Sequence, residues 1–272
     1  MNQPEKLGLI AGRGAYPLLL AESAKKQGVK RLVVVAFRGE TDRAIERLAD
    51  EVQWLKIGQL TALLDAFRES GVTRAVMAGQ ITPTRLFRVR PDRRALALLA
   101  RLRARNAETI FGAIGDELKT VGVELLPASR FMESAMPPPG LMSRRAPTPE
   151  EQADIEMGCR VAKAVSALDI GQTVVVKRGT ILAVEAFEGT DETILRAGRL
   201  GGTGAVVVKA AKRGHDMRFD IPVIGLQTLK VLKKIRAAVL VAEAGRTILL
   251  ERERVIAEAD RMGLVLVAVE ME

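Results

Sequence analysis

Cationic and acidic side chains gather in residues 209–225, a stretch that follows an apolar run and contains Pro222. Its candidate functional residues are Lys209, Lys212, Arg213, Asp216, Arg218 and Asp220. Lysine and arginine bind the oxygens of phosphate esters, and aspartate binds divalent metal ions. The stretch therefore indicates metal-assisted chemistry on a phosphate, although a solvated loop of mixed charge explains the same residues equally well.

Three more acids are candidates for the same chemistry. Glu185 and Glu188 flank the end of an expected strand, and Asp191 opens the next expected helix. Two carboxylates about 4 Å apart repel each other by roughly 4 kcal/mol at an effective dielectric of 20, so a cluster needs a cation. Magnesium suits an all-oxygen ligand set beside a phosphate. Taken singly, each acid also fits a surface position or a helix cap. For Asp191 the cap is favoured over the metal site, and Thr190 is the other candidate cap of that helix.

A glycine turn near the N-terminus is a second candidate site. Gly12, Arg13 and Gly14 stand between an expected strand and an expected helix, where backbone N–H groups can meet a phosphate. A dinucleotide fingerprint would place a third glycine where Pro17 stands, so the match to a nicotinamide site is partial. An ordinary tight turn is the alternative. Gly79–Gln80 ends another expected parallel strand and would face the same crevice.

The composition excludes several mechanisms. His215 is the single histidine among the 272 residues, so a zinc site of several histidines is excluded and carboxylates are expected as bases and metal ligands. Cys159 is the single cysteine, so no internal disulfide forms, and a reducing compartment is expected. We expect Cys159 to be a small buried apolar side chain in a helix.

The formal net charge of +9 implies an acidic partner: nucleic acid, an anionic membrane surface or a phosphorylated small molecule. Residues 85–105 are rich in arginine, with one acid, and they lack the stacking aromatics of single-strand binders. Leu96, Leu99 and Leu102 recur there at helical spacing. The pattern predicts an amphipathic basic helix that meets lipid headgroups or a partner, with a plain solvated helix as the alternative.

The sequence also bears on location. It contains no run of about 18 uncharged apolar residues, the length at which a membrane-spanning helix is inferred. The first residues do not follow the charged-then-apolar pattern of a signal peptide. The expected location is the cytoplasm.

Two α/β domains are expected to position these residues. Short apolar strands alternate with helices over residues 1–130, which predicts a Rossmann-like parallel sheet. The proline-rich residues 131–148 are expected to link it to a mixed α/β domain at residues 149–272.

Within the second domain, local signals are clear. Thr148 is a favourable N-cap for a helix that has Pro149 in its first turn and runs to about Ala167. Arg178–Gly179 predicts a hairpin between two apolar strands. Glu243 and Arg246 bracket a glycine turn and are expected to pair with each other or to contact substrate.

The chain resembles the UDP-2,3-diacylglucosamine pyrophosphatases of lipid A biosynthesis, in the family unrelated to the metallophosphoesterases. The segments that carry the resemblance are 7–14 (LGLIAGRG), 168–176 (LDIGQTVVV), 182–191 (LAVEAFEGTD), 218–225 (RFDIPVIG) and 243–246 (EAGR). The resemblance implies a magnesium-dependent hydrolase that forms UMP and 2,3-diacylglucosamine 1-phosphate, with water attacking the phosphorus nearer the sugar. It also implies a homodimer, with substrate held between a Rossmann-like domain and a second domain.

The resemblance assigns a role to Asp220, and residue chemistry suggests roles for the other candidates. Asp220 matches the essential aspartate of the family's Arg-x-Asp-x-Pro motif, and we expect it to hold the metal or activate water, with Lys209, Lys212 and Arg218 stabilising charge. Glu185, Glu188 and Asp191 are expected to complete the metal shell. Substrate-binding residues are expected at Gly12, Arg13, Gly14, Gly79, Gln80, Gln172, Gly189 and Thr190.

Two other functions are retained as alternatives. A nucleotide-sugar or lipid binding protein without catalysis would keep the glycine turn but would not need the acids. A nucleic-acid binder would depend on residues 85–105 and would show steep salt dependence; we expect no nucleic acid and possible peripheral contact with the inner membrane instead.

Overall fold

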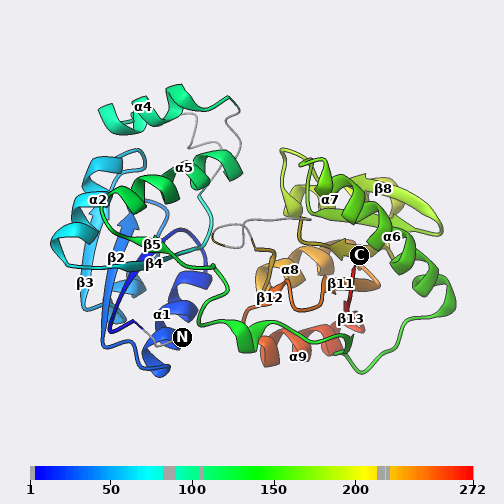
Figure 1. Ribbon diagram of the computed structural model, residues 1–272. Coiled ribbons are helices and arrows are strands. Elements are labelled where there is room, and N and C mark those ends of the chain that lie inside the picture. Colours follow the sequence, from blue (N-terminus) through cyan, green and yellow to red (C-terminus); the bar gives the residue numbers. More distant parts are fainter. Residues whose placement is uncertain (1–3, 82–89, 104–106, 213–217, 219–220, 272) are drawn as a thin grey trace. The chain divides into compact units, whose positions relative to one another are not determined.

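The structure is a computed structural model that describes residues 4–81, 90–103, 107–212, 218 and 221–271 (Figure 1). The chain forms two compact units: the first runs to Met132, and the second begins at Glu133. Arg218 groups with the first unit, although Lys212 and Ile221 group with the second. Both units combine helices with a sheet, which confirms the expected α/β class.

The first unit is built from a repeating strand and helix pattern. Its elements are β1 (Lys6–Ala11), α1 (Tyr16–Lys26), β2 (Arg31–Phe37), η1 (Arg43–Arg47), β3 (Glu51–Leu55), α2 (Leu60–Glu69), β4 (Arg74–Ala78), α4 (Arg93–Arg101), α5 (Ala107–Thr120) and β5 (Glu124–Leu125). The strands pair in parallel in the order β3-β2-β1-β4-β5. This order is doubly wound, with β1 and β4 at the point where the winding direction reverses.

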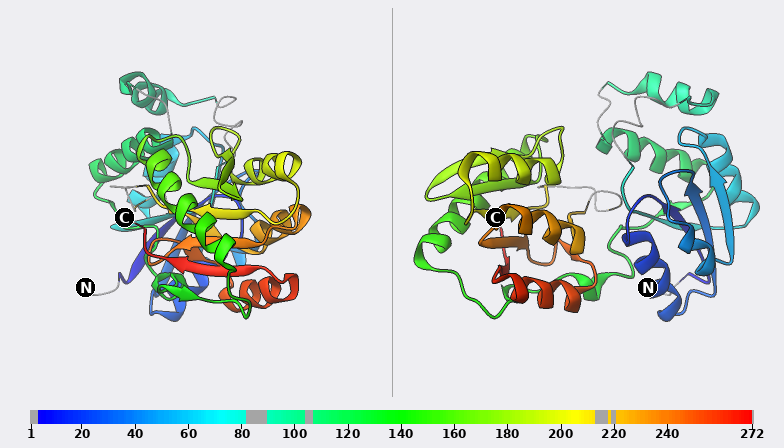
Figure 2. Two further views of the ribbon diagram at one scale, coloured as in Figure 1. Left: turned by 90° about the vertical axis from the view of Figure 1, so that its right-hand side faces the viewer. Right: turned by 180° about the vertical axis from the view of Figure 1, so that it is seen from behind.

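Burial explains the continuous apolar strands of this sheet. β1 and β2 are buried almost throughout because helices cover the sheet on both faces. One face packs against α2, α4 and α5, where Phe67 and Leu118 are completely buried. α1 contacts β1 and β4. The view from behind in Figure 2 shows the blue strands beside these helices.

η1 is a short 3-10 helix, for which Asp42 is the N-cap and accepts a 2.8 Å hydrogen bond from the Ala44 N–H. One local expectation for this unit needs correction. On α4, Leu96 is 59% exposed, so it does not share the apolar side with Leu99 and Leu102. The buried residues Ala95 and Leu98 define that side instead, because it packs against the core of its own unit.

The second unit has a mixed sheet. Its elements are η2 (Glu133–Ala135), β6 (Gly140–Leu141), α6 (Pro149–Ala167), β7 (Thr173–Lys177), β8 (Thr180–Val184), α7 (Thr190–Gly201), β9 (Val206–Lys209), β10 (Val223–Ile224), α8 (Leu226–Ile235), β11 (Val239–Glu243), β12 (Ile248–Leu249), α9 (Arg252–Met262) and β13 (Val265–Val269). The main sheet has the order β6-β13-β11-β9-β7-β8. β9, β11 and β13 are parallel, while β6 and β7 run antiparallel to their neighbours. β12 pairs with β10 in a separate sheet of two strands.

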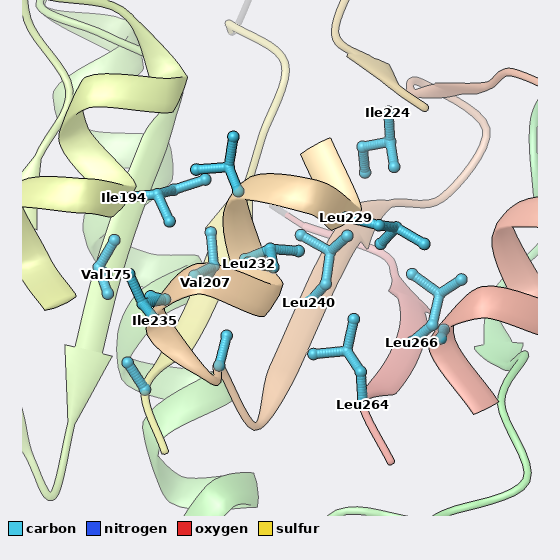
Figure 3. Packing of buried hydrophobic residues seen from close by; sticks show 14 of the residues in the cluster. Val175, Ile194, Val207, Ile224, Leu229, Leu232, Ile235, Leu240, Leu264 and Leu266 are labelled. Carbon is cyan, nitrogen blue, oxygen red and sulfur yellow. The ribbon is translucent and has the colours of Figure 1, made fainter. Parts of the chain in front are cut away.

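Helices cover both faces of this sheet. Ile155 and Ala162 of α6 pack on one face. The other face buries side chains of α7, α8 and α9, and Figure 3 shows Ile194, Leu229 and Leu232 meeting there against strand residues such as Leu240. The apolar faces of the helices and of the sheet pack closely together. This packing fixes the position of the sheet edge at which expected site residues lie.

Sequence signals set the ends of α6 and the β7–β8 hairpin. Thr148 and Glu151 form a capping box at the start of α6, and the helix ends at Ala167 as expected. Arg178 and Gly179 both have positive φ, at 48° and 70°, as a type I′ turn requires. The buried Asp154 accepts hydrogen bonds of 2.7 Å from both of their N–H groups, which fixes the hairpin to α6.

Candidate active site

In the first unit, the expected glycine turn lies at the carboxyl ends of β1 and β4. The Arg13 N–H donates to the Gln80 carbonyl at 2.7 Å, and the Gln80 N–H donates to the Arg13 carbonyl at 3.2 Å. The structure thus brings residues 12–14 and 79–80 together at the reversal point of the sheet. Ligands of doubly wound sheets bind at this position.

Glycine is required where these two segments approach. A Cβ at Gly12 would lie 2.7 Å from the Gln80 carbonyl oxygen, and a Cβ at Gly79 would lie 2.7 Å from that of Arg13. Gly79 also has a φ of +88°. A side chain at either position would separate the segments, so the glycines serve backbone packing as well as any ligand.

The same turn leaves an open approach to α1. Around Gly14, a Cβ would meet no described atom within 4 Å. Ala15 is the N-cap of α1 and provides no side-chain cap within the described residues. The first N–H groups of the helix thus have the character of an anion site, as expected for a phosphate.

In the second unit, expected site residues gather at one edge of the main sheet. Thr173 at the start of β7 pairs with Lys209 at the end of β9, and Ala242 of β11 pairs with Lys209 on the other side. Gln172 precedes β7, and its carbonyl accepts the Ala210 N–H at 2.9 Å. Glu185 follows β8, and its N–H donates to the Thr173 carbonyl at 2.8 Å. This edge therefore unites residues 172, 185 and 209.

Hydroxyl and carboxylate oxygens meet at this edge. The Thr190 hydroxyl donates to Oε1 of Glu185 at 3.0 Å and lies 3.3 Å from the Thr173 hydroxyl oxygen. Oε2 of Glu185 is buried and has no hydrogen-bond partner among the described residues. A buried carboxylate oxygen without a partner is unfavourable, so a donor or cation would stabilise Glu185 here.

The other two expected metal ligands are placed differently. Glu188 pairs with Arg196 at 2.5 Å, and this hydrogen bond lowers the pKa of the Glu188 carboxyl group. Asp191 lies 3.5 Å from the Gln227 side-chain nitrogen. The expectation that Asp191 or Thr190 caps α7 is wrong, since Gly189 is the N-cap and the helix begins at Thr190.

The two lysines of the stretch 209–225 are bound to the protein itself. Lys209 is buried, and its ammonium group donates to the Val223 carbonyl at 2.9 Å. The Lys212 ammonium lies 3.2 Å from the Asp169 carboxylate. Both lysines therefore hold the segment after β9 in place. Lys212 is half-buried and lies near the sheet edge.

Arg218 lies against α5 in the first unit, where a Cβ at Gly115 would come 3.4 Å from its Nη1. Asp220, together with Arg213, His215 and Asp216, lies outside the described residues. Among residues that are described, no group of three or more histidine, cysteine, aspartate or glutamate side chains could hold a metal. Glu185, with its unpartnered oxygen, fits a magnesium ion in part, whereas the Arg196-paired Glu188 does not.

Sequence reasoning missed one charged residue at this edge. The Lys163 ammonium of α6 donates to Oε1 of Glu243 at 2.9 Å and to the Ala211 carbonyl at 3.2 Å. Oε2 of Glu243 accepts the Ala211 N–H at 2.6 Å. Arg246 pairs with Glu243 at 3.6 Å, which confirms the expectation that these two residues pair with each other. The available signal was a lysine on the apolar side of a helix, which required a buried partner.

The fold and these two sheet edges define a protein of two α/β units with phosphate-compatible loops at the ends of parallel strands. Models of the LpxI N-terminal domain and the LpxI C-terminal domain match residues 6–135 and 138–267. A Caulobacter vibrioides protein, UDP-2,3-diacylglucosamine pyrophosphatase LpxI, is 34% identical over 278 residues, covering 97% of this chain and 98% of that protein. The chain therefore belongs to the LpxI family, which confirms the predicted resemblance.

Solved structures show only distant similarity. Phosphoribosylglycinamide synthetase from Anaerococcus prevotii matches with a TM-score of 0.26 and 12% identity, over 74% of this chain and 44% of that one. The biotin carboxylase subunit of pyruvate carboxylase matches with a TM-score of 0.26 and 15% identity, over 71% of this chain and 41% of that one. Similarity at this level establishes neither a common fold nor a common activity.

Proposed function

We propose that the chain hydrolyses the pyrophosphate bond of UDP-2,3-diacylglucosamine in lipid A biosynthesis. The observation that carries this proposal is family membership over both units, together with the name of the Caulobacter vibrioides relative. Two features of the structure support it: the glycine turn at the reversal point of the first sheet, and the lysine and hydroxyl groups at the edge of the second.

The proposed reaction transfers one phosphoryl group to water. The water oxygen bonds to the phosphorus nearer the sugar, and the bond from that phosphorus to the bridging oxygen breaks. UMP leaves with the bridging oxygen, and 2,3-diacylglucosamine 1-phosphate is the second product. Positioning and charge stabilisation dominate catalysis of such transfers, which suits the cationic loop after β9.

Magnesium is the proposed cofactor. A bound magnesium ion would neutralise charge on the diphosphate oxygens. Glu185 is the described carboxylate best suited to contribute, because Oε2 is buried without a partner among described residues. Asp220 is proposed to act with it, on the strength of its match to the family's motif, and Lys212 and Arg218 are proposed to contact the diphosphate.

The decisive experiment incubates purified protein with UDP-2,3-diacylglucosamine and magnesium in ¹⁸O-water. Release of UMP, with the label in the sugar phosphate alone, is the expected result. Label in UMP would place the attack at the other phosphorus. Substrate binding without UMP release would favour the alternative of a binding protein. Asp220→Ala is expected to abolish turnover while retaining substrate binding, and a normal rate in that variant would remove Asp220 from the mechanism.

Membrane contact, dimerisation and a cytoplasmic location are proposed as well. No helix within the described residues has the length and apolarity to span a bilayer. The outward face of α4 carries the exposed residues Arg93, Leu96 and Arg101, which suit peripheral contact with anionic lipid. Flotation with anionic vesicles tests this contact, and sedimentation tests the homodimer.

A further inference from the structure

The first unit contains an apolar cavity of about 170 Å³ next to the glycine turn. Gly12 and Gly79 contribute to its wall, so the cavity and the glycine turn share these two residues. Most of the wall is apolar, with contributions from Ile10, Leu63, Met77, Ala95, Leu98 and Phe111. The wall therefore combines β1 and β4 with α2, α4 and α5.

The lining selects an apolar ligand. Gln59 is the one polar side chain among the described lining residues, and its Oε1 already accepts the Lys56 N–H at 2.7 Å. A uracil ring, a sugar or a phosphate would lose hydrogen bonds to water in such a wall without replacing them, which is unfavourable. A hydrocarbon chain gains free energy from the same transfer.

The size and position of the cavity fit part of a chain whose head group lies at the turn. A volume of 170 Å³ corresponds to about six water-sized groups, and a methylene is of similar size. A polar head at the open side of Gly14 would leave an attached chain within reach of the cavity wall at Gly12 and Gly79.

The inward face of α4 belongs to this cavity. Ala95, Leu98 and Leu99 line it, while Leu96 and Ala97 are exposed on the other side of the helix. The apolar side of the basic helix α4 therefore packs within the first unit, and its amphipathic character needs no partner from elsewhere.

We propose that this cavity binds a segment of one acyl chain of the substrate and so sets the preferred acyl length. The proposal rests on the proposed function for the identity of the acylated substrate. Large side chains of α2, α4 and α5 form much of the wall, and the volume of about 170 Å³ limits the length of chain that the cavity accepts.

The test compares Ala95→Phe, which fills the cavity, with Ala97→Phe, which adds the same ring on the exposed side of α4. Substrates with progressively shorter acyl chains are assayed by UMP release. In the unmodified protein, kcat/KM is expected to fall about fourfold for each methylene withdrawn from the cavity. Ala95→Phe should raise KM for the long-chain substrate at least tenfold and flatten the dependence on length, while Ala97→Phe keeps it.

A second variant acts in the opposite direction and guards against a folding defect. Leu99→Ala enlarges the cavity and should shift the preference to longer chains. Unchanged length dependence in Ala95→Phe and Leu99→Ala, with folding verified by circular dichroism, would overturn the proposal while leaving the hydrolase function intact.

A binding measurement separates the two proposals. A fluorescent polyene fatty acid is titrated into the unmodified protein and both phenylalanine variants. Binding by the unmodified protein and Ala97→Phe, with at least tenfold weaker binding by Ala95→Phe, supports the acyl cavity even if no UMP is released. Absent binding by the unmodified protein, or equal binding by all three proteins, contradicts it.

Discussion

The Lys163 ammonium lies 2.9 Å from Oε1 of Glu243, and the two side chains are only 9% and 2% exposed. This pair joins α6 to the end of β11, and through the Ala211 backbone it also holds the segment after β9. The position of Lys212 therefore depends on a charge pair in the interior of the second unit.

Replacing one partner of this pair should be strongly destabilising. Lys163→Met removes the closer of the two cations from the buried Glu243 carboxylate and leaves only Arg246 at 3.6 Å. We expect the free energy of unfolding to fall by about 3 kcal/mol. Lys25→Met is the control, because its pair with Asp50 is exposed and should contribute less than about 1 kcal/mol. Urea denaturation measures both, and equal losses would show that the interior pair has no special role.

The glycine turn gives a second prediction. Gly79→Ala forces a Cβ against the Arg13 carbonyl oxygen in a left-handed backbone conformation. Gly14→Ala has the strain of a positive φ, about 1–2 kcal/mol, but meets no described atom within 4 Å. Thermal unfolding should therefore show a larger loss for Gly79→Ala, by at least about 1 kcal/mol, together with loss of UMP release. Similar stability in the two variants would mean that the segments separate easily.

The capping box of α6 predicts a pH dependence. Burial raises the pKa of Glu151, but hydrogen bonds from Arg145 and the Thr148 N–H outweigh it, so that the folded-state pKa lies below the usual 4.5. The unfolded chain then takes up a proton first as pH falls. This contribution is present above about pH 4.5 and is lost as pH falls through the lower folded-state pKa. Urea titrations from pH 6 to 3 should show a steeper loss in the unmodified protein than in Glu151→Gln; parallel curves would contradict the assignment.

Cys159 should react slowly. Burial raises the pKa of its thiol to about 11, and the nearby Glu243 carboxylate adds to this effect. The residue itself is half-buried rather than completely enclosed. Iodoacetamide attacks the thiolate, so alkylation at pH 7.5 should be much slower in the folded protein than in urea. Mass spectrometry follows the reaction, and comparable rates in both conditions would contradict the raised pKa.

Local patterns predicted much of the fold. Thr148, Pro149 and Glu151 determine the start of α6 because capping depends on residues close in sequence. The turn at Arg178–Gly179 was predicted for the same reason. The pairing of Gly12–Arg13 with Gly79–Gln80 followed from a general rule of parallel sheets, since both segments follow strands that end at one edge.

Long-range contacts were less accessible from sequence. Leu96 has helical spacing with Leu99 and Leu102, yet the inward side of α4 is fixed by packing on α2 and α5, which the helix sequence does not encode. β12 pairs with β10 in a separate sheet, and α8 and β11 lie between these two strands in sequence. The partner of Lys163 lies 80 residues away in sequence, so only the structure identifies it.

The position of Arg218 has a consequence for chimeras that combine halves of two family members. Its side chain lies beside Gly115 of α5, although its nearest described neighbours along the chain, Lys212 and Ile221, belong to the second unit. A chimera that joined the amino-terminal half of one family member to the carboxyl-terminal half of another would set a guanidinium from one parent against a helix from the other. We therefore expect such a chimera to retain this contact only where both parents carry compatible side chains at these two positions.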